Sequence, residues 1–65
     1  MKCGICGTEL NRPMAPETMD CGGDCARCMA GFGDSGCIRL LKNLGDPTKR
    51  AEVIASYEAW RVKQV

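Results

Sequence analysis

The sequence contains no histidine, and its 65 residues include only one Phe, one Tyr and one Trp. The lack of histidine removes the commonest acid–base residue of active sites. The scarcity of aromatic rings leaves little material for a large hydrophobic core. A single domain this small commonly needs a metal ion, a disulfide or a partner subunit to be stable.

The sequence also lacks long apolar runs. None approaches the length of a membrane-spanning helix, and the first residues, Met-Lys-Cys-Gly, contain no stretch typical of a signal peptide. We therefore expect a cytoplasmic protein with no membrane partner. In a reducing cytoplasm, paired cysteines are better interpreted as metal ligands than as disulfides.

Catalytic motifs are missing as well. No serine or cysteine has an evident base partner, and Gly31-Phe32-Gly33 is not followed by the Lys-Ser/Thr of a phosphate-binding loop. We predict that the protein is not an enzyme, and the chemical roles left open are thiol-based metal transfer and redox sensing.

What the sequence does contain is cysteine, six in all. Four of them form two C-x2-C pairs that are eighteen residues apart, Cys3, Cys6, Cys25 and Cys28. Four thiolates in two close pairs can complete a tetrahedron around one zinc ion and leave no position for a substrate. We predict one structural Zn²⁺ ion, whose binding energy of order ~10 kcal/mol exceeds what so small a core supplies.

Other interpretations of the cysteines stay open. The same four ligands suit a rubredoxin-like iron site, and an exported protein would use disulfides instead. Cys21 lies close enough to Cys25 to replace a member of the second pair as a ligand. A six-cysteine, two-zinc cluster would also include Cys37, which is otherwise expected to be a small buried hydrophobic residue.

Turn and cap signals predict one domain over 1–65, in two parts. In 1–33 we expect a zinc knuckle at Cys3–Gly7, a short hairpin within 8–20, and a helix that starts at Cys25 with Asp24 as its N-cap. In 34–65 we expect a helix capped by Asp34 or Ser35 that runs to Leu44, and a second from Asp46 to the last few residues. The predicted class is a small metal-stabilised α+β fold, with two or three α-helices after the hairpin.

The two later helices differ in their apolar patterns. In the first, one arc predicts a core-facing side: Cys37, Ile38, Leu40, Leu41 and Leu44. The second carries one stripe of Val53, Tyr57 and Trp60, and another on the opposite side of Ala51, Ala55, Val62 and Val65, with Ile54 at its edge. Two stripes predict a binding module that docks a protein partner or a second copy, with the aromatic residues as anchors. In the alternative interpretation, the first stripe only covers the zinc-binding part.

Charge is unevenly distributed along the chain. Residues 1–37 carry a net −2 and residues 38–65 a net +3. Nucleic-acid binding is the alternative function, through the basic residues of the later helices, Arg39, Lys42, Lys49, Arg50, Arg61 and Lys63. A solvated helix surface has the same composition. The acidic character around the cysteines is the reverse of what a nucleic-acid-binding finger normally shows.

The order of knuckle, hairpin and C-x2-C at a helix start resembles a treble-clef or zinc-ribbon finger. The C-x2-C-x18-C-x2-C spacing is similar to that of the GATA-type variety, over about residues 3–30. The resemblance implies Cys3, Cys6, Cys25 and Cys28 as ligands. It does not bring DNA binding with it, because the loop 8–20 has one basic and three acidic residues. The segment 20–30, DCGGDCARCMA, also resembles small bacterial cysteine-rich proteins of no assigned activity.

Overall fold

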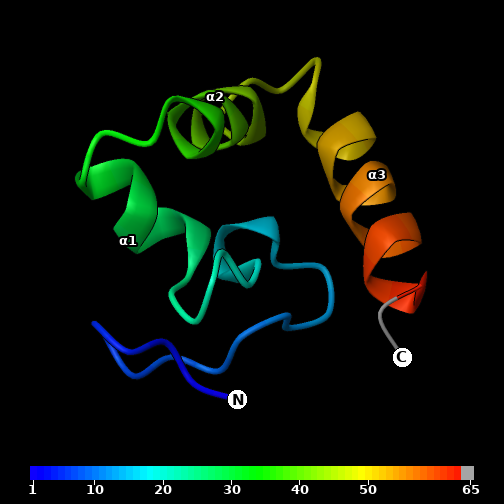
Figure 1. The fold of residues 1–65 in the computed structure, drawn as a ribbon. Coiled ribbons are helices and arrows are strands. Elements are labelled where there is room, and N and C mark those ends of the chain that lie inside the picture. The colour runs from blue at the N-terminus through cyan, green and yellow to red at the C-terminus, as the bar shows by residue number, and fades with distance from the viewer. Residues whose placement is uncertain (64–65) are drawn as a thin grey trace.

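Three α-helices follow one another around a turn-rich N-terminal segment (Figure 1). The computed structural model describes residues 1–63, and its elements are the 3₁₀-helix η1 (Pro16–Thr18), α1 (Ala26–Gly31), α2 (Ser35–Leu44) and α3 (Arg50–Lys63). Helix α2 packs against both α1 and α3, and all three helices contact η1. The result is a flat molecule of 31 × 28 × 15 Å.

Extended structure is nearly absent from residues 1–63. It is limited to two isolated antiparallel bridges, Lys2 with Glu9 and Asp20 with Cys25. The hairpin predicted within 8–20 is not formed there, because that segment instead contains η1 and two residues with positive φ, Asn11 and Met14. Proline at the start of η1 fixes a turn conformation and donates no ladder hydrogen bond. The α+β prediction is therefore correct for the helices and wrong for the hairpin.

Helix α2 has the bounds that its cap signals predict. The Asp34 carboxylate accepts a hydrogen bond from the Cys37 amide at 3.0 Å, which satisfies one of the free N–H groups of the first turn. Of the predicted core arc, Cys37 and Leu44 are buried, but Ile38 is 47% exposed. The apolar arc is broader than the surface that α1 and α3 cover, so its edge at Ile38 faces solvent.

The other two helices start later than predicted. Helix α1 begins at Ala26 with Cys25, not Asp24, in the N-cap position. Helix α3 begins at Arg50 rather than Asp46, because residues 46–49 form a separate turn in which the Asp46 carboxylate accepts hydrogen bonds from both the amide and the hydroxyl of Thr48. The predicted stripe residue Val65 lies outside the described residues.

Helix α3 is anchored to the N-terminal half through Tyr57. This side chain is 1% exposed, and its hydroxyl donates a 2.7 Å hydrogen bond to the Arg12 carbonyl oxygen. One residue further on, the Glu58 carboxylate accepts a hydrogen bond from the Met14 amide at 2.9 Å. These contacts join α3 to a segment more than forty residues away in the sequence. None of the helices in residues 1–63 combines the length and apolar character of a membrane-spanning segment.

Candidate metal centre

The first cysteine pair lies in a tight turn at Cys3–Gly7. The Gly7 amide donates to the Cys3 carbonyl oxygen at 3.0 Å, and the Cys3 amide donates to the Thr8 carbonyl oxygen at 2.8 Å. Gly7 has a φ of +75°, which a residue with a Cβ adopts only at a cost. The turn directs the amides of Ile5 and Cys6 toward the Cys3 Sγ, each at 3.4 Å, as a knuckle around an anionic sulfur requires.

The second pair is placed by the start of α1. Cys25 is the N-cap with an extended backbone, and Cys28 follows in the first helical turn. The preceding glycine turn is joined to the knuckle by a 3.0 Å hydrogen bond from the Gly4 amide to the Gly23 carbonyl oxygen. The Cys25 amide also donates to the Cys3 Sγ at 3.3 Å. Backbone hydrogen bonds therefore hold the two pairs together, although eighteen residues separate Cys6 from Cys25 in the sequence.

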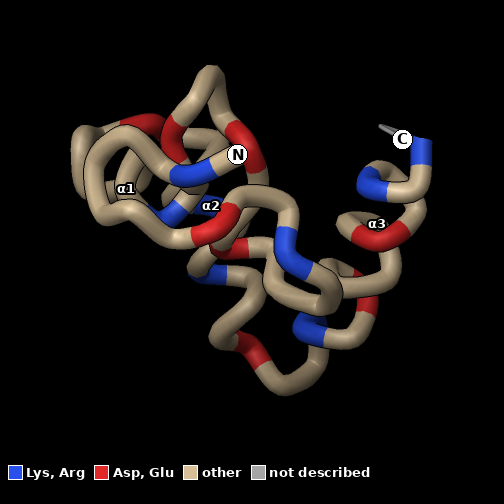
Figure 2. The backbone as a smooth tube through the Cα atoms, turned by 90° about the horizontal axis from the view of Figure 1, so that it is seen from below, with Lys and Arg blue, Asp and Glu red and all other residues tan. Residues whose placement is uncertain are grey.

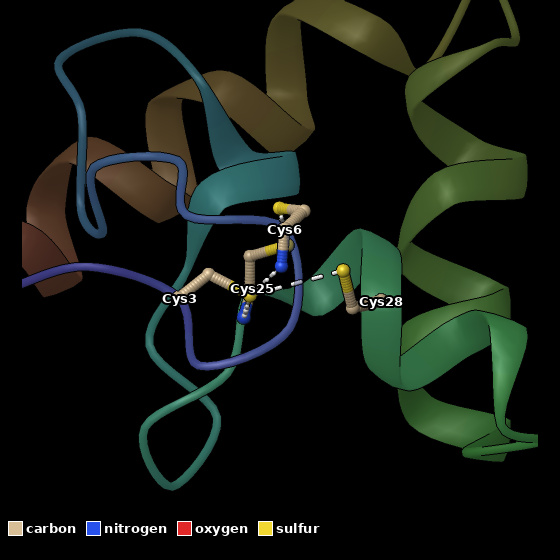
Figure 3. A group of neighbouring side chains, drawn as sticks. All are labelled: Cys3, Cys6, Cys25 and Cys28. Carbon is tan, nitrogen blue, oxygen red and sulfur yellow. Dashed lines mark hydrogen bonds between the residues drawn. The ribbon is translucent and has the colours of Figure 1, made fainter.

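The four sulfurs form a compact group (Figure 3). All four Sγ atoms lie within 4.8 Å of one another, and the distances from Cys3 to Cys28 and from Cys6 to Cys25 are both 3.8 Å. A tetrahedral ion with metal–sulfur bonds of about 2.3 Å holds its sulfurs about 3.8 Å apart. The group therefore has the size of a tetrahedral tetrathiolate site.

The thiol pKa values in this group differ because the sulfurs have different partners. Hydrogen bonds from the amides of Cys6, Cys25 and Ile5 lower the pKa of Cys3 to about 6. Burial raises the pKa of Cys25, and the hydrogen bond with the Cys25 thiol is the main cause that raises the pKa of Cys28. Four negative sulfurs cannot share so small a volume without a cation, and a bound dication would stabilise all four as thiolates.

The sulfur group is also part of the hydrophobic core. Cys3 and Cys25 are buried and pack with Leu10, while Cys28 is half-buried and Cys6 is exposed. Sequence reasoning did not identify Leu10 as core, although it is the one large aliphatic residue of its loop. Because the candidate ligands are also core residues, metal binding would be coupled directly to folding.

Cys21 and Cys37 lie outside this group. Their Sγ atoms are 3.6 Å apart, and Cys21 is half-buried whereas Cys37 is buried. Neither of these sulfurs lies with the other four. Among the described residues, only one group of three or more Cys, Asp or Glu side chains is compact enough to hold a metal ion, and its members are Cys3, Cys6, Cys25 and Cys28.

The residues of the predicted interaction stripe on α3 differ in how deeply they are buried. Tyr57 is buried in the interior. For this residue the structure favours the alternative interpretation, in which the stripe packs on the N-terminal part instead of docking a partner. Val53 and Trp60 are half-buried and line a groove of about 620 Å³ between α2 and α3, together with Leu40 of α2. Trp60 stacks near Tyr57 with ring centroids 6.0 Å apart.

One polar residue of structural importance was not anticipated. Thr18 is 4% exposed, and its hydroxyl donates to the Ala15 carbonyl oxygen at 2.7 Å and accepts from the Arg12 amide at 3.0 Å. These bonds fix the loop that receives Tyr57. Nothing in the local sequence distinguishes this threonine from a surface one.

No protein-family model matches the chain, and no curated protein or solved structure shows significant similarity to it. The likeness to a zinc finger rests on the cysteine spacing and on the group of four sulfurs.

Proposed function

We propose that this protein is a small zinc-binding module, in which one Zn²⁺ ion bound by Cys3, Cys6, Cys25 and Cys28 stabilises the fold that presents α2 and α3. The observation that carries the proposal is the pair of 3.8 Å sulfur–sulfur distances, which match a tetrahedral tetrathiolate site. A bound ion would offset the repulsion between sulfurs that are already held together by the backbone.

Zinc fits these ligands better than the other metals. Thiolates are soft ligands, and four of them in a tetrahedron select zinc or iron. The core around the sulfurs contains Leu10 and no aromatic ring, which supports zinc over a rubredoxin-like iron site. The ion would have a structural role, because four protein ligands leave no open position for a substrate. We propose no catalytic activity.

Single serine substitutions test the ligand set. Cys3→Ser and Cys28→Ser should each abolish stoichiometric zinc binding or weaken it by at least about 100-fold. Each substitution removes a sulfur that would bind the ion directly and that also packs in the core. Native mass spectrometry and competition with a zinc chelator measure the effect. The matched control is Cys37→Ser, which should retain one zinc ion; loss of the metal in this control would bring Cys37 into the ligand set and contradict the assignment.

We further propose that the groove between α2 and α3 accepts a second copy of the chain. The groove is apolar at Leu40, Val53 and Trp60, and its rim carries the opposite charges of Lys49 and Glu52. Beside it lies a second hollow that shares Asn43 and Lys49 with the groove and is lined by the exposed Ile38. In the proposed dimer, Ile38 of each copy enters the apolar groove of the other about a two-fold axis, so that each copy contributes both parts of the interface.

Ile38→Glu tests this dimer. The substitution should weaken self-association at least about tenfold, because it replaces an apolar contact with a carboxylate that would have to lose its water to enter the apolar groove of the other copy. Ile38 is 47% exposed, so the monomer should remain folded. Sedimentation equilibrium over a wide concentration range measures the dissociation constant. Phe32→Glu is the matched control, since Phe32 is 73% exposed in the connection between α1 and α2, away from the groove. A wild-type protein that stays monomeric at high concentration would exclude the dimer.

The charge distribution gives less support to nucleic-acid binding. Arg61 forms two 2.9 Å hydrogen bonds with the Glu58 carboxylate, and Arg50 donates to the Leu44 carbonyl oxygen at 3.3 Å. Basic and acidic positions are interspersed along the backbone, and the basic ones do not form one continuous stripe (Figure 2). We therefore favour a protein partner over a nucleic acid.

A further inference from the structure

A second pair of cysteines is not used by the proposed metal centre. The Sγ atoms of Cys21 and Cys37 are 3.6 Å apart, although the residues belong to separate elements. Cys21 lies in the glycine turn before α1, and Cys37 lies in the first turn of α2. The sulfurs are in contact, and fifteen residues of chain lie between the two cysteines.

Hydrogen bonds fix the backbone on both sides of this contact. In the turn, the Cys21 amide donates to the Asp24 carbonyl oxygen at 2.8 Å, and the Gly23 amide donates to the Asp20 carboxylate at 2.7 Å. On α2, the Cys37 amide donates to the Asp34 carboxylate at 3.0 Å. Two locally ordered segments therefore hold the two sulfurs together, so little conformational entropy remains to be lost when a bond forms between them.

The pair does not have the composition of a metal site. Within the part of the chain that the structure describes, no third Cys, Asp or Glu ligand atom joins these two sulfurs in a group of metal-binding size. Two ligands alone do not make a tetrahedral centre. The chemistry available to two adjacent thiols without a metal is oxidation to a disulfide, in which the sulfurs move to about 2.05 Å apart.

We propose that Cys21 and Cys37 form a reversible intramolecular disulfide when the protein meets a low-molecular-weight disulfide such as oxidised glutathione, while the other four cysteines stay bound to the metal. The Cys21 thiolate attacks one sulfur of the oxidant, which forms a mixed disulfide and releases one glutathione thiolate. The Cys37 sulfur then loses its proton and attacks the Cys21 sulfur, and the second glutathione leaves. The two cysteines are oxidised by two electrons and lose two protons, and the oxidant is reduced to two glutathione molecules.

The order of the two steps follows from accessibility. Cys21 is half-buried and can be reached by the oxidant, whereas Cys37 is buried. Burial is the main cause that raises the pKa of Cys37 to about 12, with a further contribution from the Cys21 thiol. Cys37 therefore reacts second, with a sulfur that is already beside it.

The bond would connect the metal-bearing turn to α2. The loop that it closes contains Cys25 and Cys28, two of the four proposed zinc ligands. A cross-link that closes a loop of this length restricts the unfolded chain, and for a domain of this size we expect the melting temperature to rise by about 10 °C. The oxidised protein is then the more stable form of the module.

Treatment of the metal-loaded protein with oxidised glutathione tests the proposal. The intact mass should decrease by two hydrogen atoms with the zinc retained. A protease that cleaves before aspartate should then give one disulfide-linked pair of peptides, residues 20–23 and 34–45, since cleavage at Asp20, Asp24, Asp34 and Asp46 isolates Cys21 and Cys37 from all other cysteines. Cys37→Ser should stop at the mixed disulfide on Cys21, and Cys21→Ser should react far more slowly.

Two results would overturn the proposal. One is a wild-type protein that accumulates the mixed disulfide on Cys21 while Cys37 stays reduced. Another is a disulfide that maps to the peptides 1–19 or 24–33 and forms with loss of zinc, which would make the metal ligands the reactive thiols.

Discussion

Removal of the metal is expected to unfold the N-terminal half and to abolish the cooperative thermal transition of the whole chain. The proposed ligands Cys3 and Cys25 are themselves core residues and pack with Leu10, so the ion and the core are lost together. Apparent binding energies of structural zinc sites are about 10–16 kcal/mol, against a total stability of about 5–15 kcal/mol for typical domains. The metal-free chain should therefore have no stable native state.

Trp60 reports this transition directly. It is the only tryptophan of the sequence, it is half-buried, and it lies 6.0 Å from the Tyr57 ring that anchors α3 to the N-terminal half. Addition of a strong chelator should shift its emission to the red and reduce the helical circular dichroism signal, and excess zinc should restore both. The control is the same chelator already saturated with zinc. A chelated protein that melts cooperatively within a few degrees of the untreated one would contradict the expectation.

Tyr57→Ala is expected to destabilise the metal-loaded protein by about 3–5 kcal/mol, the range observed for large buried aromatic side chains. Tyr57 is 1% exposed and is the largest fully buried side chain. Its removal leaves a cavity between α3 and the segment that carries η1, and it leaves the Arg12 carbonyl oxygen without its 2.7 Å partner. In a domain this small, such a loss approaches the total stability.

Tyr57→Phe is the matched variant, since it keeps the ring and removes only the hydroxyl. It should cost about 1 kcal/mol, the typical net contribution of one hydrogen bond. Urea titrations with zinc in excess compare the three proteins without interference from metal loss. If Tyr57→Ala lowers the free energy of unfolding no more than Tyr57→Phe does, the ring does not anchor α3, and α3 does not pack on the N-terminal half through this residue.

The parts of the structure that depend on local sequence could be predicted. The knuckle follows from the two-residue spacing of Cys3 and Cys6 and from Gly7, which adopts the positive φ expected of it. The bounds of α2 follow from its own cap, Asp34, and from the glycine at position 45. In both cases, residues a few positions apart determine the conformation.

Features that depend on distant contacts could not be predicted in the same way. The periodicity of α3 identifies Tyr57 as part of an apolar stripe, but its burial depends on the Arg12 carbonyl oxygen, 45 residues away. The contact of Cys21 with Cys37 depends on how α2 packs beside the glycine turn, which cysteine spacing does not encode. The hairpin prediction failed because the turns at Asn11, Met14 and η1 replaced regular strands.

X-ray absorption at the zinc edge shows whether one zinc ion is bound by four thiolates. We expect a zinc edge and a single first shell of four sulfur scatterers at about 2.3 Å. Nitrogen or oxygen scatterers in that shell, fewer than four sulfurs, or a metal-loaded protein whose absorption edge is that of iron would contradict the assignment of Cys3, Cys6, Cys25 and Cys28 as a zinc site.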